Sequence, residues 1–169
     1  MSSGVGPVAS RPKMFGGVAE PVLLPWSWAL DRLSHARNYW IATTRPDGRP
    51  HSRPVWGVLV DEAVFFSTGS LAVANLACSP EISLHTESAT ELVILEGVAT
   101  VEIDRSVIVR VCDDYSVKYD EALDADHLPG PFYRVRTRVA FGWLATPSFT
   151  DGGAVFHGTA TKWTFAGEA

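Results

Sequence analysis

The chain is poor in cysteine. Its 169 residues include two, Cys78 and Cys112, which are too few for a disulfide framework and show no metal-ligand spacing. The first twenty residues carry Arg11 and Lys13 but no continuous apolar block after them, so no secretory signal is expected. Together these absences predict a protein of the reducing cytoplasm.

Long apolar runs and an excess of positive charge are also absent. No run approaches the ~20 apolar residues that cross a bilayer, so we expect no membrane partner. The formal net charge of −5 disfavours nucleic acid as a partner, because nucleic-acid binding is driven by basic surface that neutralises phosphates. The hydrophobic fraction of 46% indicates a chain that folds around a core rather than a disordered one.

The motifs of several catalytic classes are missing. The sequence contains no nucleophile elbow, Walker loop or paired-carboxylate motif, so it assigns no catalytic residue. Its five histidines lack ligand spacing, which argues against a metal site. No Lys or Arg lies between Arg53 and Arg105. The middle of the chain therefore has no cation to offer an anionic ligand.

What is present divides into a tail and a body. Residues 1–22 are rich in Ser, Gly and Pro without a period, which predicts a flexible N-terminal tail. Residues 23–169 have the length of one domain and predict a single unit with its own core.

Apolar spacing and turn residues define the expected elements. Helices are predicted over residues 26–36 and 71–78, and a third helix follows an N-cap at Asp104. The apolar stripe of this third helix comprises Ile108, Val111, Tyr115 and Tyr119. Strands are predicted over residues 38–44, 51–60, 63–68, 81–86, 91–103, 132–144 and 155–165, with a bend or bulge at Gly97. This pattern predicts a mainly β fold, a closed or nearly closed β-barrel with few short helices.

The segment over residues 38–76 carries the most chemistry. Residues 46–48, Pro-Asp-Gly, suit a tight turn between two strands. His51 and Arg53 lie one strand period apart on the second strand, so their side chains face the same way. The small-residue loop before the helix at residue 71 can hold a phosphate with its amides. The segment therefore predicts a site for a phosphorylated, flat cofactor.

Ordered motifs along the chain resemble a known family. They are ATTRPDGRPHSRPVW (42–56), VFFSTG (64–69), ANL (74–76), HTES (85–88), LEGVATV (95–101) and YRVRTRVAFGW (133–143). This set resembles the FMN-binding split β-barrel group, which comprises pyridoxamine 5'-phosphate oxidase-like proteins and the related reductases that use deazaflavin, coenzyme F-420. The resemblance spans roughly residues 26–165.

The resemblance implies a homodimer that binds its cofactor in a groove between subunits. The strand ending at Trp56 would follow the ring, the loop after Ser67 would meet the phosphate arm, and Trp143 and Lys162 would approach from the partner. The cofactor-binding residues implied in this way, together with candidates from the loop chemistry, are His51, Arg53, Pro54, Val55, Trp56, Ser67, Thr68, Gly69, Ser70, Asn75, Trp143 and Lys162.

One departure from the family pattern affects the choice of function. Members usually carry Lys and Arg just after the third strand, where this chain has Leu71, Ala72, Val73 and Ala74. A charge-assisted hydrogen bond contributes about 1.5–3 kcal/mol, so losing two would weaken phosphate binding by roughly two to four orders of magnitude. The cofactor would then bind weakly, be anchored differently, or be absent.

Two functions follow as expectations. The first is an oxidoreductase that uses F-420 or FMN for hydride transfer to a planar conjugated small molecule. F-420 is placed slightly ahead of FMN because the RPHSRPVW and AFGW segments resemble the deazaflavin reductases more than true pyridoxamine-phosphate oxidases. The alternative is a non-catalytic binding protein that has kept the barrel and lost or altered cofactor binding. Structural roles remain open for the same residues: Arg53 as a surface arginine, and Ser67, Thr68 and Ser70 as strand-end and helix-capping residues.

Overall fold

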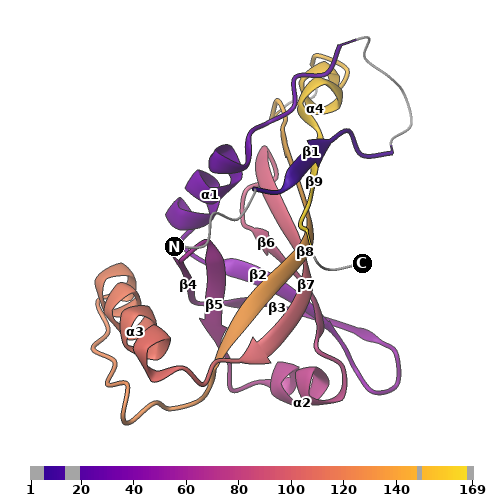
Figure 1. Cartoon of the computed structure of the whole chain (residues 1–169). Helices are drawn as coiled ribbons and strands as arrows, with labels where there is room; N and C mark the ends of the chain where they lie inside the picture. Colours follow the sequence, from indigo (N-terminus) through magenta and orange to yellow (C-terminus); the bar gives the residue numbers. More distant parts are fainter. Residues whose placement is uncertain (1–5, 14–19, 148–149, 167–169) are drawn as a thin grey trace.

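The computed structural model of the chain describes residues 6–13, 20–147 and 150–166 (Figure 1). Within those residues, four helices accompany one sheet of nine strands. The helices are α1 (Trp26–His35), α2 (Leu71–Cys78), α3 (Arg105–Tyr119) and α4 (Ala154–Thr159). The strands are β1 (Val8–Ser10), β2 (Tyr39–Thr44), β3 (Pro50–Val55), β4 (Gly57–Val60), β5 (Ala63–Ser67), β6 (Glu81–Thr86), β7 (Glu91–Val101), β8 (Phe132–Leu144) and β9 (Thr161–Thr164). The predicted mainly β fold is confirmed.

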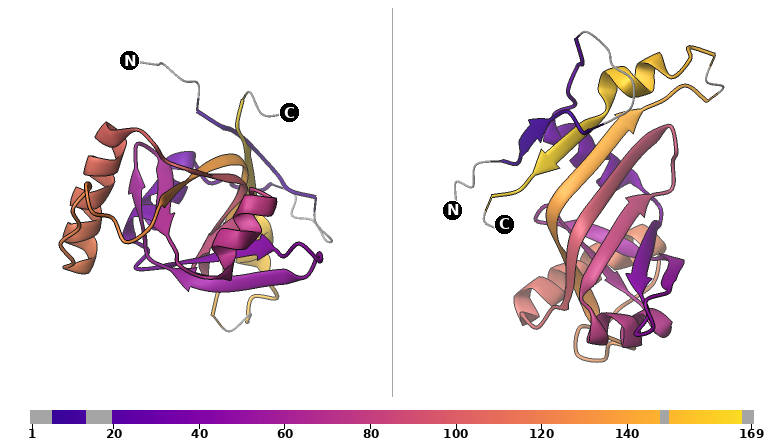
Figure 2. Two further views of the ribbon diagram at one scale, coloured as in Figure 1. Left: turned by 90° about the horizontal axis from the view of Figure 1, so that it is seen from below. Right: turned by 90° about the vertical axis from the view of Figure 1, so that its right-hand side faces the viewer.

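The antiparallel sheet is organised around β8. Its strands follow the order β1-β9-β8-β7-β6-β2-β3, and β5 joins β4 to another part of β8. Residues 132–134 of β8 pair with β5, whereas residues 139–142 pair with β9. β7 accompanies β8 along the whole of its other edge, and the two appear as long neighbouring strands in Figure 2. β8 therefore joins two sections of the sheet.

The sheet wraps around the core without closing through strand pairing. β3 pairs with β2 and β4 pairs with β5, but no ladder joins β3 to β4 among the described residues. The chain passes directly from β3 to β4 through Trp56. The single strand predicted over residues 51–60 is therefore wrong at Trp56, and the closed form of the predicted barrel is not adopted.

Side-chain alternation places one face of the sheet in the core. β2 buries Tyr39, Ile41 and Thr43 and leaves the residues between them more accessible, as expected for a half-buried strand. Trp163 of β9 and Leu33 of α1 are completely buried in the same cluster. α1 thus covers this core, while α3 forms a second, smaller core with β4 and β5.

α3 carries the predicted apolar stripe. Val111, Tyr115 and Tyr119 are buried, and Ile108 packs against them. The helix begins after Asp104, whose Oδ1 accepts a hydrogen bond of 2.8 Å from the backbone N–H of Ser106. Hydrogen bonds from the Ser106 hydroxyl and N–H lower the pKa of Asp104, because they stabilise the carboxylate. The predicted N-cap and stripe are both confirmed.

A bulge interrupts the pairing of β7 with β8 at the predicted glycine. The register shifts between Glu96 and Gly97. A Cβ atom built on Gly97 would lie 2.0 Å from the carbonyl oxygen of Arg136. Glycine therefore lets the two backbones approach this closely.

The strand predicted over residues 155–165 is wrong in its first half. α4 occupies that half, and β9 begins only at Thr161. The Asp151 carboxylate accepts hydrogen bonds from the N–H groups of Gly153 (3.1 Å) and Val155 (2.9 Å). Gly153 itself has a φ of 80°. These local bonds start a helix that the short apolar run around Val155 cannot reveal by its periodicity.

Part of the predicted tail forms a strand. Residues 8–10, in β1, pair with residues 162–164 of β9, which sequence reasoning did not anticipate. Residues 1–5 and 14–19 of that segment lie outside the described residues, so the flexible tail over residues 1–22 and the single domain over residues 23–169 stay predictions. No helix in the described part of the chain is long and apolar enough to cross a membrane.

Candidate functional site

The junction between β3 and β4 is held by α3. The Tyr119 hydroxyl accepts a hydrogen bond from the N–H of Gly57 (2.8 Å) and also lies 3.0 Å from the Gly57 carbonyl and 2.7 Å from the Arg37 carbonyl. The Trp56 ring stacks on the Tyr119 ring, with centroids 4.6 Å apart and planes at 5°. The half-exposed Trp56 ring is thereby fixed at the molecular surface.

A cavity of about 420 Å³ opens beside this junction. It lies between the end of β3 and the end of β5, two segments that β4 separates in the chain. Seven of the twelve predicted site residues line it: Arg53, Pro54, Val55, Trp56, Ser67, Thr68 and Gly69. The predicted grouping of these two segments is therefore present in the fold.

Arg53 provides a guanidinium at the cavity. Its Nε donates a hydrogen bond of 3.3 Å to the carbonyl of Pro54. Among the described residues, no carboxylate forms an ion pair with it, whereas Arg49 in the neighbouring turn is paired with Asp47 at 2.7 Å. The terminal nitrogens of Arg53 therefore remain available to an anion.

The loop after β5 caps α2 as the sequence indicates. The Ser70 hydroxyl accepts a hydrogen bond from the N–H of Ala72 (3.2 Å) and lies 2.9 Å from the Thr68 hydroxyl. Ser70 does not line the cavity, although Thr68 and Gly69 before it do. In the first turn of α2, Leu71 is 46% exposed and Ala74 is also exposed. The helix start thus presents apolar side chains where the family pattern has cations.

Two further predicted residues lie outside the cavity and brace the fold. Asn75 is completely buried, and its Nδ2 donates a hydrogen bond of 2.9 Å to the Thr43 hydroxyl. That hydroxyl also lies 3.5 Å from Nδ1 of His51. Asn75 Oδ1 has no hydrogen-bond partner among the described residues. These contacts connect α2 to β2 and β3.

Trp143 and Lys162 lie at the other end of the sheet. Trp143 packs edge-on against Phe156 of α4, with centroids 5.3 Å apart, and Lys162 of β9 is opposite Phe141. Figure 1 shows α4 at one end of the molecule and α2 and α3 at the other. Neither residue reaches the cavity of its own chain. Their predicted approach from a partner subunit stays a prediction.

Sequence reasoning missed two residues that line the cavity and two cations beside the Tyr119 ring. Asn38 and Tyr115 line it, and Arg37 and Lys118 surround the Tyr119 ring at 4.9 and 5.4 Å from its centroid. The sequence placed Tyr115 and Tyr119 on one helix face. It gave no signal that this face meets the β3–β4 junction, since the contact joins segments about sixty residues apart.

Lys118 is a half-buried cation with a perturbed proton affinity. Its Nζ donates a hydrogen bond of 2.6 Å to the Gly57 carbonyl and lies 4.8 Å from the centroid of the Tyr39 ring. Burial, aided by the positive charge of Arg37, lowers the pKa of Lys118 to about 8. The Arg37 guanidinium also donates to the Lys118 carbonyl. This cluster fixes the end of α3.

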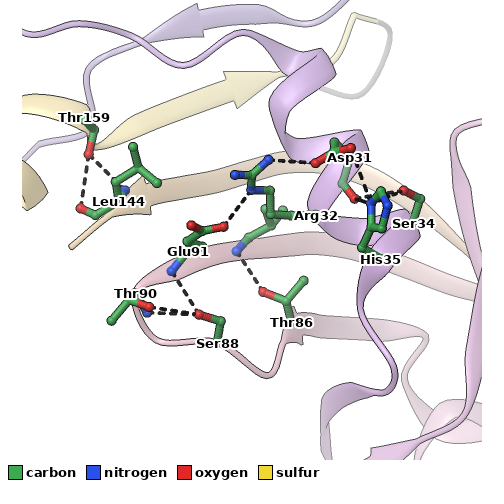
Figure 3. Close-up of polar contacts among 11 residues, drawn as sticks. Asp31, Arg32, Ser34, His35, Thr86, Ser88, Thr90, Glu91, Leu144 and Thr159 are labelled. Carbon is green, nitrogen blue, oxygen red and sulfur yellow. Dashed lines mark hydrogen bonds and ion pairs between the residues drawn. The ribbon is translucent and has the colours of Figure 1, made fainter. Parts of the chain in front are cut away.

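Another cavity, of about 470 Å³, lies between α1 and the β6–β7 turn (Figure 3). Arg32 there bonds Asp31 at 2.7 Å and Glu91 at 3.0 Å. Ser88 accepts from the Glu91 N–H at 3.0 Å. Arg32 thereby fastens α1 to β7 through Glu91. In the described part of the chain, no three His, Cys, Asp or Glu side chains gather as metal ligands do.

A family model described as pyridoxamine 5'-phosphate oxidase matches residues 29–146. Among curated proteins, no sequence matches the chain. A solved structure of a conserved hypothetical protein from Mycobacterium tuberculosis is 22% identical with a TM-score of 0.65, over 76% of this chain and 89% of that one. HutZ, the heme storage protein from Vibrio cholerae, is 19% identical with a TM-score of 0.54, over 64% and 87%.

A pyridoxamine 5'-phosphate oxidase-related, FMN-binding protein from Nostoc punctiforme is 14% identical with a TM-score of 0.50, over 72% of this chain and 84% of that one. Identities this low establish a shared fold alone. The family model, in contrast, matches more than half of the chain. The chain therefore belongs to the pyridoxamine 5'-phosphate oxidase-like split-barrel family, as its motifs predicted.

Proposed function

We propose that this protein is an oxidoreductase that binds a flavin-type cofactor, F-420 or FMN, in the cavity beside Trp56. One observation carries the proposal: Arg53, the β5 end at Ser67–Gly69 and the fixed Trp56 ring line a single cavity. The family match and the FMN-binding structural relative support it. F-420 is placed ahead of FMN because the RPHSRPVW and AFGW segments resemble the deazaflavin reductases.

The donors at the cavity fit a phosphorylated, flat group. Its volume of about 420 Å³ falls within the roughly 300–1,000 Å³ of small-molecule sites. The Arg53 guanidinium and the Ser67 and Thr68 hydroxyls are the donor types that bind phosphate. Trp56 and Tyr115 supply aromatic surface for a ring. The residues present therefore suit the cofactor even without the usual cation cluster.

Each residue would have a distinct task. Arg53 would hold the phosphate, with the Ser67 and Thr68 hydroxyls supplementing it. Trp56, kept in place by Tyr119, would define the plane of the ring and exclude water from one side. The bound cofactor would supply hydride to a planar conjugated small molecule. The protein's contribution is then positioning and water exclusion.

We further propose a homodimer of the reducing cytoplasm. Trp143 and Lys162 lie far from the cavity of their own chain, so they could contribute only to the site of another copy. Cys78 and Cys112 are both free thiols, which suits a reducing compartment. No membrane or nucleic-acid partner is part of the proposal.

A non-catalytic binding protein is the second candidate. The observation that favours it is the first turn of α2, where the exposed Leu71 and Ala74 carry no charge. Under this alternative the cavity would bind a different planar ligand, or none.

One titration separates the two candidates. The purified protein is titrated with F-420 and with FMN at low and at physiological salt, following cofactor fluorescence. The oxidoreductase requires binding of at least one cofactor. If neither binds at tens of micromolar, the non-catalytic alternative stands.

A further inference from the structure

A second cavity, of about 290 Å³, adjoins the candidate cofactor site beneath the loop that connects α3 to β8. Trp56, Ser67 and Tyr115 line both cavities. One aromatic pair and one hydroxyl therefore line both cavities, and molecules bound in the two cavities would be neighbours.

The remaining walls of the second cavity are mostly apolar. Leu123, Leu128 and Pro129 of the loop line it together with Phe132 of β8. Leu123 and Leu128 are partly buried and pack against the smaller core of α3. The N–H of Leu123 also donates a hydrogen bond of 3.3 Å to the Ser116 hydroxyl on α3. The cavity is thus a built part of the fold.

Charge at the second cavity is of one sign. Of the described residues that line it, Glu121 is the one that carries a charge, and no Lys or Arg contributes. A phosphate or carboxylate placed there would lose its hydration without gaining a cationic partner, which is unfavourable. An uncharged flat molecule would instead gain by burying apolar surface against Leu128 and Phe132.

We propose that this second cavity binds the organic substrate, and that the substrate is a flat aromatic or conjugated molecule without a phosphate or other anionic group. The inference rests on the proposed function in calling the occupant a substrate. The binding itself needs no cofactor and can be measured without one. A phosphate ester is excluded from this cavity by the same reasoning.

Direct binding to the cofactor-free protein is the first test. We would titrate 1-naphthol and 1-naphthyl phosphate separately by calorimetry at neutral pH into the Arg53→Ala variant, because Arg53 of the parent lines the neighbouring cavity and could hold the phosphate probe there. The two probes share the ring system and differ in charge. We expect 1-naphthyl phosphate to bind at least tenfold more weakly than 1-naphthol. Equal or tighter binding of the phosphate, or no binding of 1-naphthol at millimolar concentration, would overturn the proposal.

Variants of the cavity wall locate the probe. Leu128→Glu places a carboxylate among the apolar walls and should weaken 1-naphthol binding at least tenfold. Val117→Glu is the matched control, since Val117 lies on α3 at 87% exposure and does not line the cavity. Unchanged 1-naphthol binding by Leu128→Glu would contradict the location.

Gly130→Val covers the case in which Leu128→Glu does not fold. A Cβ on Gly130 would lie 3.7 Å from the Ser67 hydroxyl, in ordinary contact, and the methyl groups of valine add volume beside Ser67, which lines both cavities. We expect this variant to weaken 1-naphthol binding at least tenfold.

Cofactor titrations of the same variants separate this inference from the proposed function. We expect F-420 or FMN affinity to stay within about twofold of the parent in Leu128→Glu. Parallel loss of cofactor and 1-naphthol binding would show that the second cavity holds the cofactor ring, which overturns the substrate assignment alone. If the unmutated protein binds neither F-420 nor FMN, the proposed function is overturned and the 1-naphthol result still stands.

Discussion

Tyr119 acts on the candidate site through its hydroxyl, which contacts both backbone groups of Gly57 and the carbonyl of Arg37. It thereby determines where Trp56 lies, although it lines neither cavity itself. Such a residue positions the site without touching a ligand. Its effect on binding is therefore indirect, whereas that of Arg53 is direct.

Replacing Arg53 with Ala should weaken the binding of phosphate-bearing cofactors by roughly ten- to a hundredfold, because one charge-assisted hydrogen bond is lost. Riboflavin, which lacks the phosphate, should bind nearly as before. Fluorescence titration of FMN and riboflavin measures both. Arg49→Ala is the control, since Arg49 pairs with Asp47 in the turn and lies outside the cavity. Equal weakening of FMN and riboflavin would mean that Arg53 does not contact the phosphate.

Lys118 should make stability depend on pH above neutrality. Its pKa in the folded protein is about 8, below the ~10.4 of an unfolded chain. Between these values the unfolded state binds more protons, so the free energy of unfolding rises with pH; below about pH 8 this gain is absent. Lys118→Met should flatten the rise. Urea denaturation at pH 7.5, 8.5 and 9.5 measures it, and identical slopes for the two proteins would refute the assignment.

Most elements could be predicted because their signals are local. The N-cap at Asp104, the glycine at the β7 bulge and the capped start of α2 were all readable from neighbouring residues. α4 was not, since the carboxylate of Asp151 decides between helix and strand there and a short apolar run fits both. The contribution of Tyr115 to the cavity depends on packing between distant segments, which periodicity does not encode.

The β7 bulge gives a prediction for stability. Gly97→Ala should lower the free energy of unfolding by about 1–3 kcal/mol, because the added Cβ meets the Arg136 carbonyl and two paired strands must move apart. Gly158→Ala in α4 is the contrast: its Cβ meets nothing within 4 Å, and alanine is favoured over glycine in helices by roughly 0.5–1 kcal/mol. Thermal unfolding of Gly97→Ala, Gly158→Ala and the unmutated protein measures the two changes in stability. A stable Gly97→Ala protein would mean that the bulge can relax.

The first turn of α2 can be given the cation that it lacks. Leu71→Lys should tighten FMN binding about tenfold by adding one charge-assisted contact to the phosphate, with riboflavin unaffected. Ala77→Lys, at an exposed position in the last turn of the same helix, is the control for general attraction of anions. If both variants tighten FMN binding equally, the α2 start is not beside the phosphate.

For the whole molecule, the predicted site residues fall into two groups. Arg53 and Ser67 line the cavity beside Trp56, whereas Trp143 packs against Phe156 of α4 and Lys162 lies on β9. No sequence pattern distinguishes residues that complete their own cavity from those that complete a neighbour's. That distinction depends on quaternary structure.

Light scattering at micromolar concentration should give twice the chain mass, and a persistent monomer would contradict the dimer. Subunit mixing then tests the shared site. Arg53→Ala and Trp143→Ala proteins should each bind cofactor weakly, and mixing them should restore tight binding at a fraction of sites, because one site of each mixed dimer is intact. Absence of recovery after confirmed exchange would place Trp143 outside the site.

The triple pairing of β8 has a consequence for engineering. A residue inserted within this strand would turn every later side chain of the strand to the opposite face of the sheet. The pairing with β7 and with β5 or β9 would be disturbed at the same time. The exposed turn around residues 46–48 has no such constraint, since it joins only β2 and β3. Peptide tags, fluorophore sites and circular breakpoints therefore belong in that turn, and library diversity along β8 is best restricted to substitutions that keep its length.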